Sequence, residues 1–169
     1  MSNKTKVTNI VIAGLGGQGV LKASDIVAAV AFGAGLDVKK SEIHGMSQRG
    51  GSVTSDVRFG EQVYSPMVPP GEADYLLVLS PDQVETNRWQ LRAEGKLITP
   101  AVIPPGALRD KRSLNVALLG CLSVGLSFSE SAWLDALRQN LAPKLHATNL
   151  QAFEIGRAEA RNVSGTPKP

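Results

Sequence analysis

The spacing of apolar and polar residues divides the start of the chain into two strands with a helix between them. Residues 7–13 are mostly apolar, which is typical of a strand buried on both faces, as parallel strands are. From Gly17 to Ala34 apolar residues recur at helical spacing, which predicts a helix. Residues 36–43 predict a second strand. The chain therefore begins with the β-α-β order of a crossover unit.

The middle of the chain predicts further strands. Residues 53–59 alternate between apolar and polar side chains, which indicates a half-exposed strand. The turn-forming residues 60–62 predict a hairpin that leads into a short antiparallel partner. Residues 75–79 predict a buried strand, a helix follows Ser80, and residues 96–99 predict another short strand.

The last third of the chain has helical spacing in three segments, which are residues 114–126, 129–141 and 148–160. The resulting order, β-α-β-β-β-α-β-α-α-α, predicts an α/β fold. We expect a single Rossmann-like domain, with a mostly parallel sheet, helices on both faces and a β-hairpin excursion. This domain would cover residues 1–161, and residues 162–169 would form a short disordered tail.

Composition narrows the possible classes of protein. A chain of 169 residues, 43% of them hydrophobic and 20% charged, can bury one core but is too short for two ordinary domains. The net charge is only +3 and the basic residues are scattered, so no nucleic-acid partner is expected. No stretch of about 20 apolar residues occurs, so no membrane span is expected. Without a recognisable signal peptide, the expected location is cytoplasmic.

Cysteine usage restricts the chemistry further. Cys121 is the only cysteine, so the chain can form neither an internal disulfide nor a self-contained zinc or iron–sulfur site. It lies within an apolar run, where a small buried residue is more common than a nucleophile. The two histidines, His44 and His146, are far apart in the sequence and have no metal-ligand spacing, so no metal site is expected.

A glycine cluster follows the first predicted strand. Gly14, Gly16 and Gly19 fit the G-x-G-x-x-G spacing of a dinucleotide-binding turn. The same stretch does not fit a nucleotide-phosphate loop, because Val20 and Leu21 stand where lysine and a hydroxyl residue are required.

A dinucleotide also needs an acidic residue at the end of the second strand to bind the ribose hydroxyls. Asp37 lies at the wrong end of that strand, and Glu42 lies at the right end but leads directly into a polar loop. Two interpretations of the glycine cluster therefore remain: it binds a dinucleotide, or it forms a tight turn that is purely structural.

The polar, glycine-rich stretch from His44 to Ser52 follows the second strand. Loops at the carboxyl ends of strands form the ligand-binding edge of an open α/β sheet. His44 and Ser47 lack a third partner for nucleophilic catalysis. Arg49, followed by Gly50-Gly51, suits an anion or a carboxylate of a partner, or an arginine that rigidifies the loop by binding carbonyl groups.

These motifs resemble a known family. The turn 14–20 and the stretch 41–52 together are similar to the gamma-type domain of 2-oxoacid:ferredoxin oxidoreductases. The sequence His-Gly-Met-Ser-Gln-Arg-Gly-Gly at 44–51 most resembles the small (beta) subunits of indolepyruvate ferredoxin oxidoreductases. Later positions, including Asn115, Asn149 and Gly156, agree, so that the resemblance covers nearly the whole chain.

The resemblance implies a division of labour between subunits. In that family a large subunit carries thiamine diphosphate, with its Mg²⁺, and [4Fe–4S] clusters. The reaction oxidatively decarboxylates an aryl pyruvate, with coenzyme A as acyl acceptor and ferredoxin as electron acceptor. This chain would be the small, non-catalytic subunit, with no cofactor of its own and with the large subunit as its partner.

By the same resemblance, two groups of residues would face the large subunit or the entrance for substrate and coenzyme A. The first is a cofactor-binding or interface turn formed by Gly14, Gly16, Gly17, Gln18 and Gly19. The second is an entrance or interface loop that contains His44, Ser47, Gln48, Arg49, Gly50 and Gly51, with Arg49 as the expected charged contact. The alternative is a stand-alone Rossmann-type protein that binds NAD(P) or a nucleotide.

Overall fold

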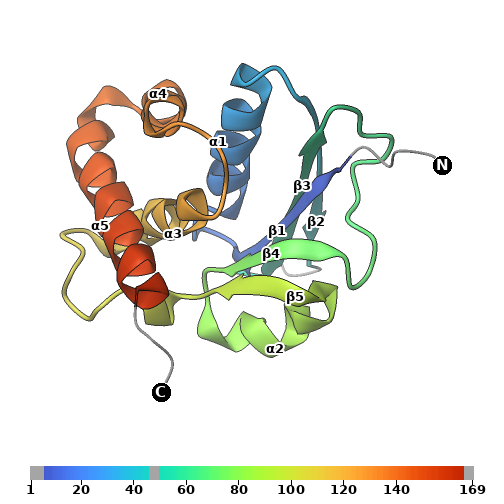
Figure 1. Cartoon of the computed structure of the whole chain (residues 1–169). Coiled ribbons are helices and arrows are strands. Elements are labelled where there is room, and N and C mark those ends of the chain that lie inside the picture. The colour runs from blue at the N-terminus through green and yellow to red at the C-terminus, as the bar shows by residue number, and fades with distance from the viewer. Residues whose placement is uncertain (1–5, 46–49, 166–169) are drawn as a thin grey trace.

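The structure, a computed structural model, describes residues 6–45 and 50–165 and has one five-stranded sheet at its centre (Figure 1). The strands are β1 (Thr8–Leu15), β2 (Asp37–His44), β3 (Ser52–Gly60), β4 (Ala73–Val78) and β5 (Leu91–Ile98). Their spatial order is β2-β3-β1-β4-β5. Strands β1, β4 and β5 pair in parallel, whereas β3 is antiparallel to both of its neighbours, β1 and β2.

The helices cover the two faces of the sheet unequally. They are α1 (Val20–Gly33), α2 (Val84–Asn87), α3 (Leu114–Val124), α4 (Glu130–Asn140) and α5 (His146–Ser164). The four longer helices lie on one face, and the short α2 lies on the other (Figure 1). The α/β class, the order of strands and helices, and the presence of helices on both faces are confirmed. None of the helices in residues 6–45 and 50–165 is both long and apolar enough to cross a membrane.

The structure corrects the position of the predicted hairpin. The hairpin is formed by β2 and β3 instead of by a turn at 60–62. Because β3 runs antiparallel to both of its neighbours, the sheet is mixed, with β1, β2, β4 and β5 running in the same direction. Residues 61–72 contain no strand, and Val68 in this segment packs against Val11 and Ala13 of β1 and Leu76 and Val78 of β4. In addition, α5 continues to Ser164, so the first residues assigned to the tail are helical.

Side chains of the sheet hold residues 61–72 in place. The backbone N–H of Val63 donates to Asp37 Oδ2, and that of Val68 donates to Asp56 Oδ2, both at 2.8 Å. Arg58 donates to the carbonyl oxygens of Ser65 and Met67. The polar residues that alternate along β3 therefore satisfy the backbone of a loop that would otherwise be left unpaired on the sheet.

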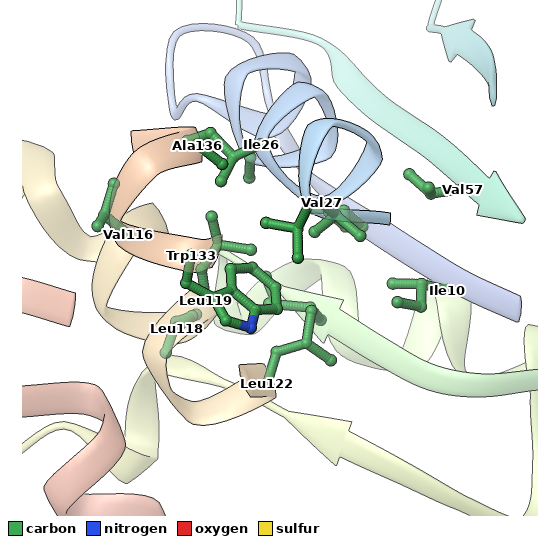
Figure 2. Packing of buried hydrophobic residues seen from close by; sticks show 14 of the residues in the cluster. Ile10, Ile26, Val27, Val57, Val116, Leu118, Leu119, Leu122, Trp133 and Ala136 are labelled. Carbon is green, nitrogen blue, oxygen red and sulfur yellow. The ribbon is translucent and has the colours of Figure 1, made fainter. Parts of the chain in front are cut away.

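The main core lies between the sheet and the four longer helices. Trp133 of α4 is fully buried and points into the space between α1 and α3, beside Val27, Leu119 and Leu122 (Figure 2). Its ring is 5.9 Å from that of Phe153 on α5. This cluster joins the helices to one another as well as to the sheet.

The closest helix packing is between α3 and α5. A Cβ atom added at Gly120 would lie 2.1 Å from the carbonyl oxygen of Phe153, and one added at Gly156 would lie 1.8 Å from that of Ala117. The two backbones can approach this closely only because neither residue has a side chain. The thiol of Cys121 donates to the carbonyl oxygen of Gly156 at 3.2 Å, so the cysteine is a packing residue of this crossing.

We predict that Gly156→Ala lowers the free energy of unfolding by at least about 2 kcal/mol, because the methyl group forces the helices apart. Urea denaturation measures the change. Gly33→Ala is the matched control, since a Cβ there meets nothing within 4 Å and the helix gains propensity. Equal stability of the two variants would contradict the close crossing.

The buried carboxyl group of Asp56 should make the stability of the fold depend on pH. Burial raises the pKa of this carboxyl group, while the Val68 N–H and Arg58 act in the opposite direction. A raised pKa in the folded state means that stability is lost as the pH rises through that pKa. Measured against Asp56→Asn, which keeps an acceptor for Val68, the wild-type chain should gain stability between pH 7 and pH 4. Urea unfolding at both pH values tests this, and an unchanged difference between the two proteins would refute it.

Candidate functional site

The register of the sheet brings the two glycine-rich segments to one edge. Gly14 of β1 pairs with Val53 of β3, and Val53 also pairs with His44 at the end of β2. The turn after β1 and the loop between β2 and β3 therefore leave the sheet side by side. We call this the carboxyl edge, because β1 and β2 both end there.

The turn after β1 depends on its glycines and on Gln18. Gly17 and Gly19 have φ angles of +87° and +84°, in the left-handed region that favours glycine. The Gln18 side chain accepts a hydrogen bond from the backbone N–H of Leu15 at 2.7 Å, and its own backbone N–H donates to the carbonyl oxygen of Leu15 at 3.1 Å. Gln18 therefore closes the turn and has a structural role in this arrangement.

Helix α3 holds the other end of the turn. Asn115, which is buried, donates from Nδ2 to the carbonyl oxygen of Gly19 at 3.2 Å, and that oxygen also accepts the first helical bond from Ala23. A Cβ atom at Gly19 would lie 2.3 Å from Asn115 Nδ2. The turn is therefore clamped between α1 and α3, a contact that the spacing of glycines alone did not reveal.

The second loop is joined to the first by its backbone. The N–H of Gly16 donates to the carbonyl oxygen of Gly51 at 2.8 Å, and the N–H of Gly45 donates to that of Ser52 at 2.7 Å. Gly50 has a φ angle of +65°. Of the residues predicted for this loop, Ser47, Gln48 and Arg49 lie outside the described residues.

An open pocket of about 390 Å³ lies where the two segments meet. It is lined by Leu15, Gly16, Gly17, Gly19, Val20, Leu21, Lys22, His44 and Val53. The structure thus brings predicted residues of both groups together. Gly14 and Gln18 do not line the pocket, and the side chain of Gln18 is instead bonded to the backbone of Leu15.

Lys22 is a member of the pocket that the sequence analysis missed. It lies in the first turn of α1, where no acidic residue offsets the partial positive charge of the helix N-terminus. A lysine at this position is unfavourable for the helix and favourable for a bound anion, and that mismatch was a signal available in the sequence. Together with the exposed His44, Lys22 makes this edge able to attract an anionic group.

In the structure, the acidic residue that the dinucleotide hypothesis requires does not lie beside the glycine turn. Strand β3 separates β2 from β1, so Glu42 is two strands, or about 10 Å, from the glycine turn. Its carboxylate lies 3.5 Å from Lys40 Nζ and 3.8 Å from His44 Nε2. Glu42 is thus part of a charged row on β2 and does not face a ribose beside β1.

The groups that the described part of the edge presents favour binding over chemical catalysis. Within residues 6–45 and 50–165, no three His, Cys, Asp or Glu residues are grouped so as to hold a metal ion. Cys121 lies away from this edge in the α3–α5 crossing, and burial raises its pKa to about 11, which keeps the thiol protonated. What the edge offers is backbone N–H groups, a helix N-terminus and Lys22.

Comparison with known proteins identifies the family, which the geometry of the edge alone does not. Residues 9–111 match the family model described as pyruvate ferredoxin/flavodoxin oxidoreductase. The indolepyruvate oxidoreductase subunit IorB of Thermococcus kodakarensis is 36% identical, over 95% of this chain and 99% of that protein.

Two solved structures share the fold. A keto/oxoacid ferredoxin oxidoreductase gamma subunit from Geobacter sulfurreducens has a TM-score of 0.74 at 24% identity, with 92% of this chain and 99% of that chain covered. The 2-oxoglutarate:ferredoxin oxidoreductase of Magnetococcus marinus, solved with 2-oxoglutarate, coenzyme A and succinyl-CoA bound, has a TM-score of 0.79 at 22% identity, and the match covers 94% of this chain and 32% of that chain.

The chain belongs to the pyruvate ferredoxin/flavodoxin oxidoreductase family. Within this family it groups with the IorB subunits of indolepyruvate oxidoreductases. The family resemblance expected from the two glycine motifs is therefore confirmed.

The geometry of the turn predicts unequal effects for two glycine substitutions. Gly17→Ala and Gly19→Ala impose the same left-handed strain of about 1–2 kcal/mol. Only Gly19→Ala also brings a methyl group against Asn115, so it should cost at least about 1 kcal/mol more in urea denaturation. Adding Asn115→Ala should recover part of that excess. If the two single variants are equally stable, Asn115 does not clamp the turn.

Proposed function

We propose that this chain is the small, non-catalytic subunit of a ferredoxin-dependent oxidoreductase that converts an aryl 2-oxoacid, indolepyruvate first among them, to an acyl-CoA. The observation that carries the proposal is the similarity to IorB subunits over almost the full length of both proteins. The structure contributes a carboxyl edge whose described residues include groups suited to anion recognition.

The proposed enzyme divides its chemistry between two subunits. Thiamine diphosphate, Mg²⁺ and the [4Fe–4S] clusters would belong to a large partner subunit, and ferredoxin would meet the complex through that partner. A chain with one cysteine, which is buried against a helix, has no ligand set for a cluster of its own. The complex would work in the cytoplasm.

The carboxyl edge would face the large subunit or the entrance for coenzyme A. Coenzyme A carries phosphates, which helix N-termini and exposed backbone N–H groups bind well. Lys22 and the N-terminus of α1 supply positive charge beside the glycine turn. A coenzyme A complex is among the solved relatives of this fold, which is consistent with an entrance near this domain.

The first test is to co-express this chain, carrying an affinity tag, with the large subunit of its native organism. We predict that the large subunit co-purifies, that the complex has the broad visible absorption of iron–sulfur clusters, and that it oxidises indolepyruvate in a coenzyme A-dependent reaction. A colourless chain that purifies alone with a bound nucleotide would instead support the stand-alone alternative.

The second test concerns the charges of the edge. We predict that Arg49→Ala and Lys22→Ala each weaken association with the large subunit, or raise the KM for coenzyme A, about fivefold or more, because each removes a cation from the proposed contact. Lys144→Ala is the matched control, since Lys144 is exposed in a short turn between α4 and α5. If neither quantity changes in the two edge variants, the role proposed for this edge is wrong.

A further inference from the structure

A larger groove lies between β5 and the helices α3 and α5. Strand β5 is the outermost strand at the opposite end of the sheet order from β2 (Figure 1). Its volume is about 670 Å³, which is within the range of ligand sites in proteins. Residues 96–98 of β5 and the adjoining Thr99 form one wall, and the C-terminal ends of α3 and α5 form the other. The groove shares no lining residue with the pocket at the carboxyl edge.

The walls of the groove are mainly apolar and are left open to solvent. Val124 at the end of α3 is 37% exposed, and Val163 near the end of α5 is 69% exposed. Ile98 and Val102 continue the apolar lining. Because α3 and α5 cross at the closest packing in the molecule, these walls are held by rigid elements, and a bound apolar group would gain by covering them.

One cation marks the end of this groove. Lys96 lines both the apolar groove and an adjoining charged pocket of about 380 Å³, and Tyr75 and Gly125 are likewise common to both. Within the described ranges 6–45 and 50–165, Lys96 has no ion-pair partner. Its ammonium group is therefore available to an anion that enters the groove.

The nearby carboxylates do not occupy this position. Asp74 pairs with Arg92 at 3.0 Å and accepts a hydrogen bond from the backbone N–H of Asn9 at 2.8 Å. Glu94 lines the charged pocket but not the apolar groove. Tyr75 donates its hydroxyl hydrogen to the carbonyl oxygen of Gly125 at 2.7 Å, so its ring forms a fixed floor between the two pockets.

We propose that this groove binds an amphipathic monocarboxylate, with an aromatic or branched aliphatic body against Val124 and Val163 and its carboxylate at Lys96. An apolar wall with one available cation at its end is complementary to that chemical class. The site is separate from the carboxyl edge, and the proposal does not depend on the role of the large subunit.

The test is calorimetric titration of the full chain with naphthalene-1-acetate, and with the neutral naphthalene-1-acetamide as its counterpart. We expect one acid to bind per chain with a Kd of about 1 mM or tighter. Lys96→Gln should weaken binding of the acid about fivefold and leave binding of the amide unchanged. Ala160→Trp, which fills the groove from α5, should abolish binding of both compounds.

Two matched variants serve as controls. Lys144→Gln removes an exposed lysine elsewhere, and Ala158→Trp adds the same bulk to the solvent-exposed side of α5, so both should bind like the wild type. Thermal unfolding checks that all four variants are folded. The proposal is overturned if the acid does not bind the wild type, if Lys96→Gln weakens acid and amide equally, or if amide-proton shifts in NMR place the acid outside the groove.

Discussion

The insertion of β3 between β1 and β2 is the constraint on which the carboxyl edge depends. Because β3 runs antiparallel to both neighbours, the end of β1, the end of β2 and the start of β3 come together. In a sheet with β2 paired directly to β1, a dinucleotide could bridge the glycine turn and an acidic residue on β2. Here a strand occupies that place, and the edge instead joins two glycine-rich loops through backbone hydrogen bonds.

The inner side of the glycine turn is held by hydrogen bonds, and its outer side is open to a ligand. Gln18 and Asn115 satisfy its inner polar groups, so its shape is set before any ligand arrives. Gly16 and Gly17 remain on the pocket surface beside Lys22. A structural role of the turn is therefore compatible with binding at its outer surface, since a turn held from inside is preorganised and loses little entropy on binding.

The described part of the molecule presents surfaces suited to binding, and its cysteine is used for packing. The lone cysteine is used in the crossing of α3 and α5, where it bonds the carbonyl oxygen of Gly156. The two recognised surfaces, the carboxyl edge and the β5 groove, differ in chemistry, with backbone N–H groups and a helix N-terminus at one and apolar walls at the other. Such a division suits a subunit that assembles with a catalytic partner, as we propose for this chain.

The sequence by itself determined the order of strands and helices, the positions of the two glycine-rich loops and the absence of a cluster-binding cysteine set, because these follow from local periodicity and composition. Only the tertiary structure decided the order of strands in the sheet, the path of residues 61–72 and the hydrogen bond from Asn115 to Gly19. The residues in each of these contacts are distant in the chain, and the register that brings them together is set by packing over the whole domain. The local pattern of apolar and polar residues does not predict that packing.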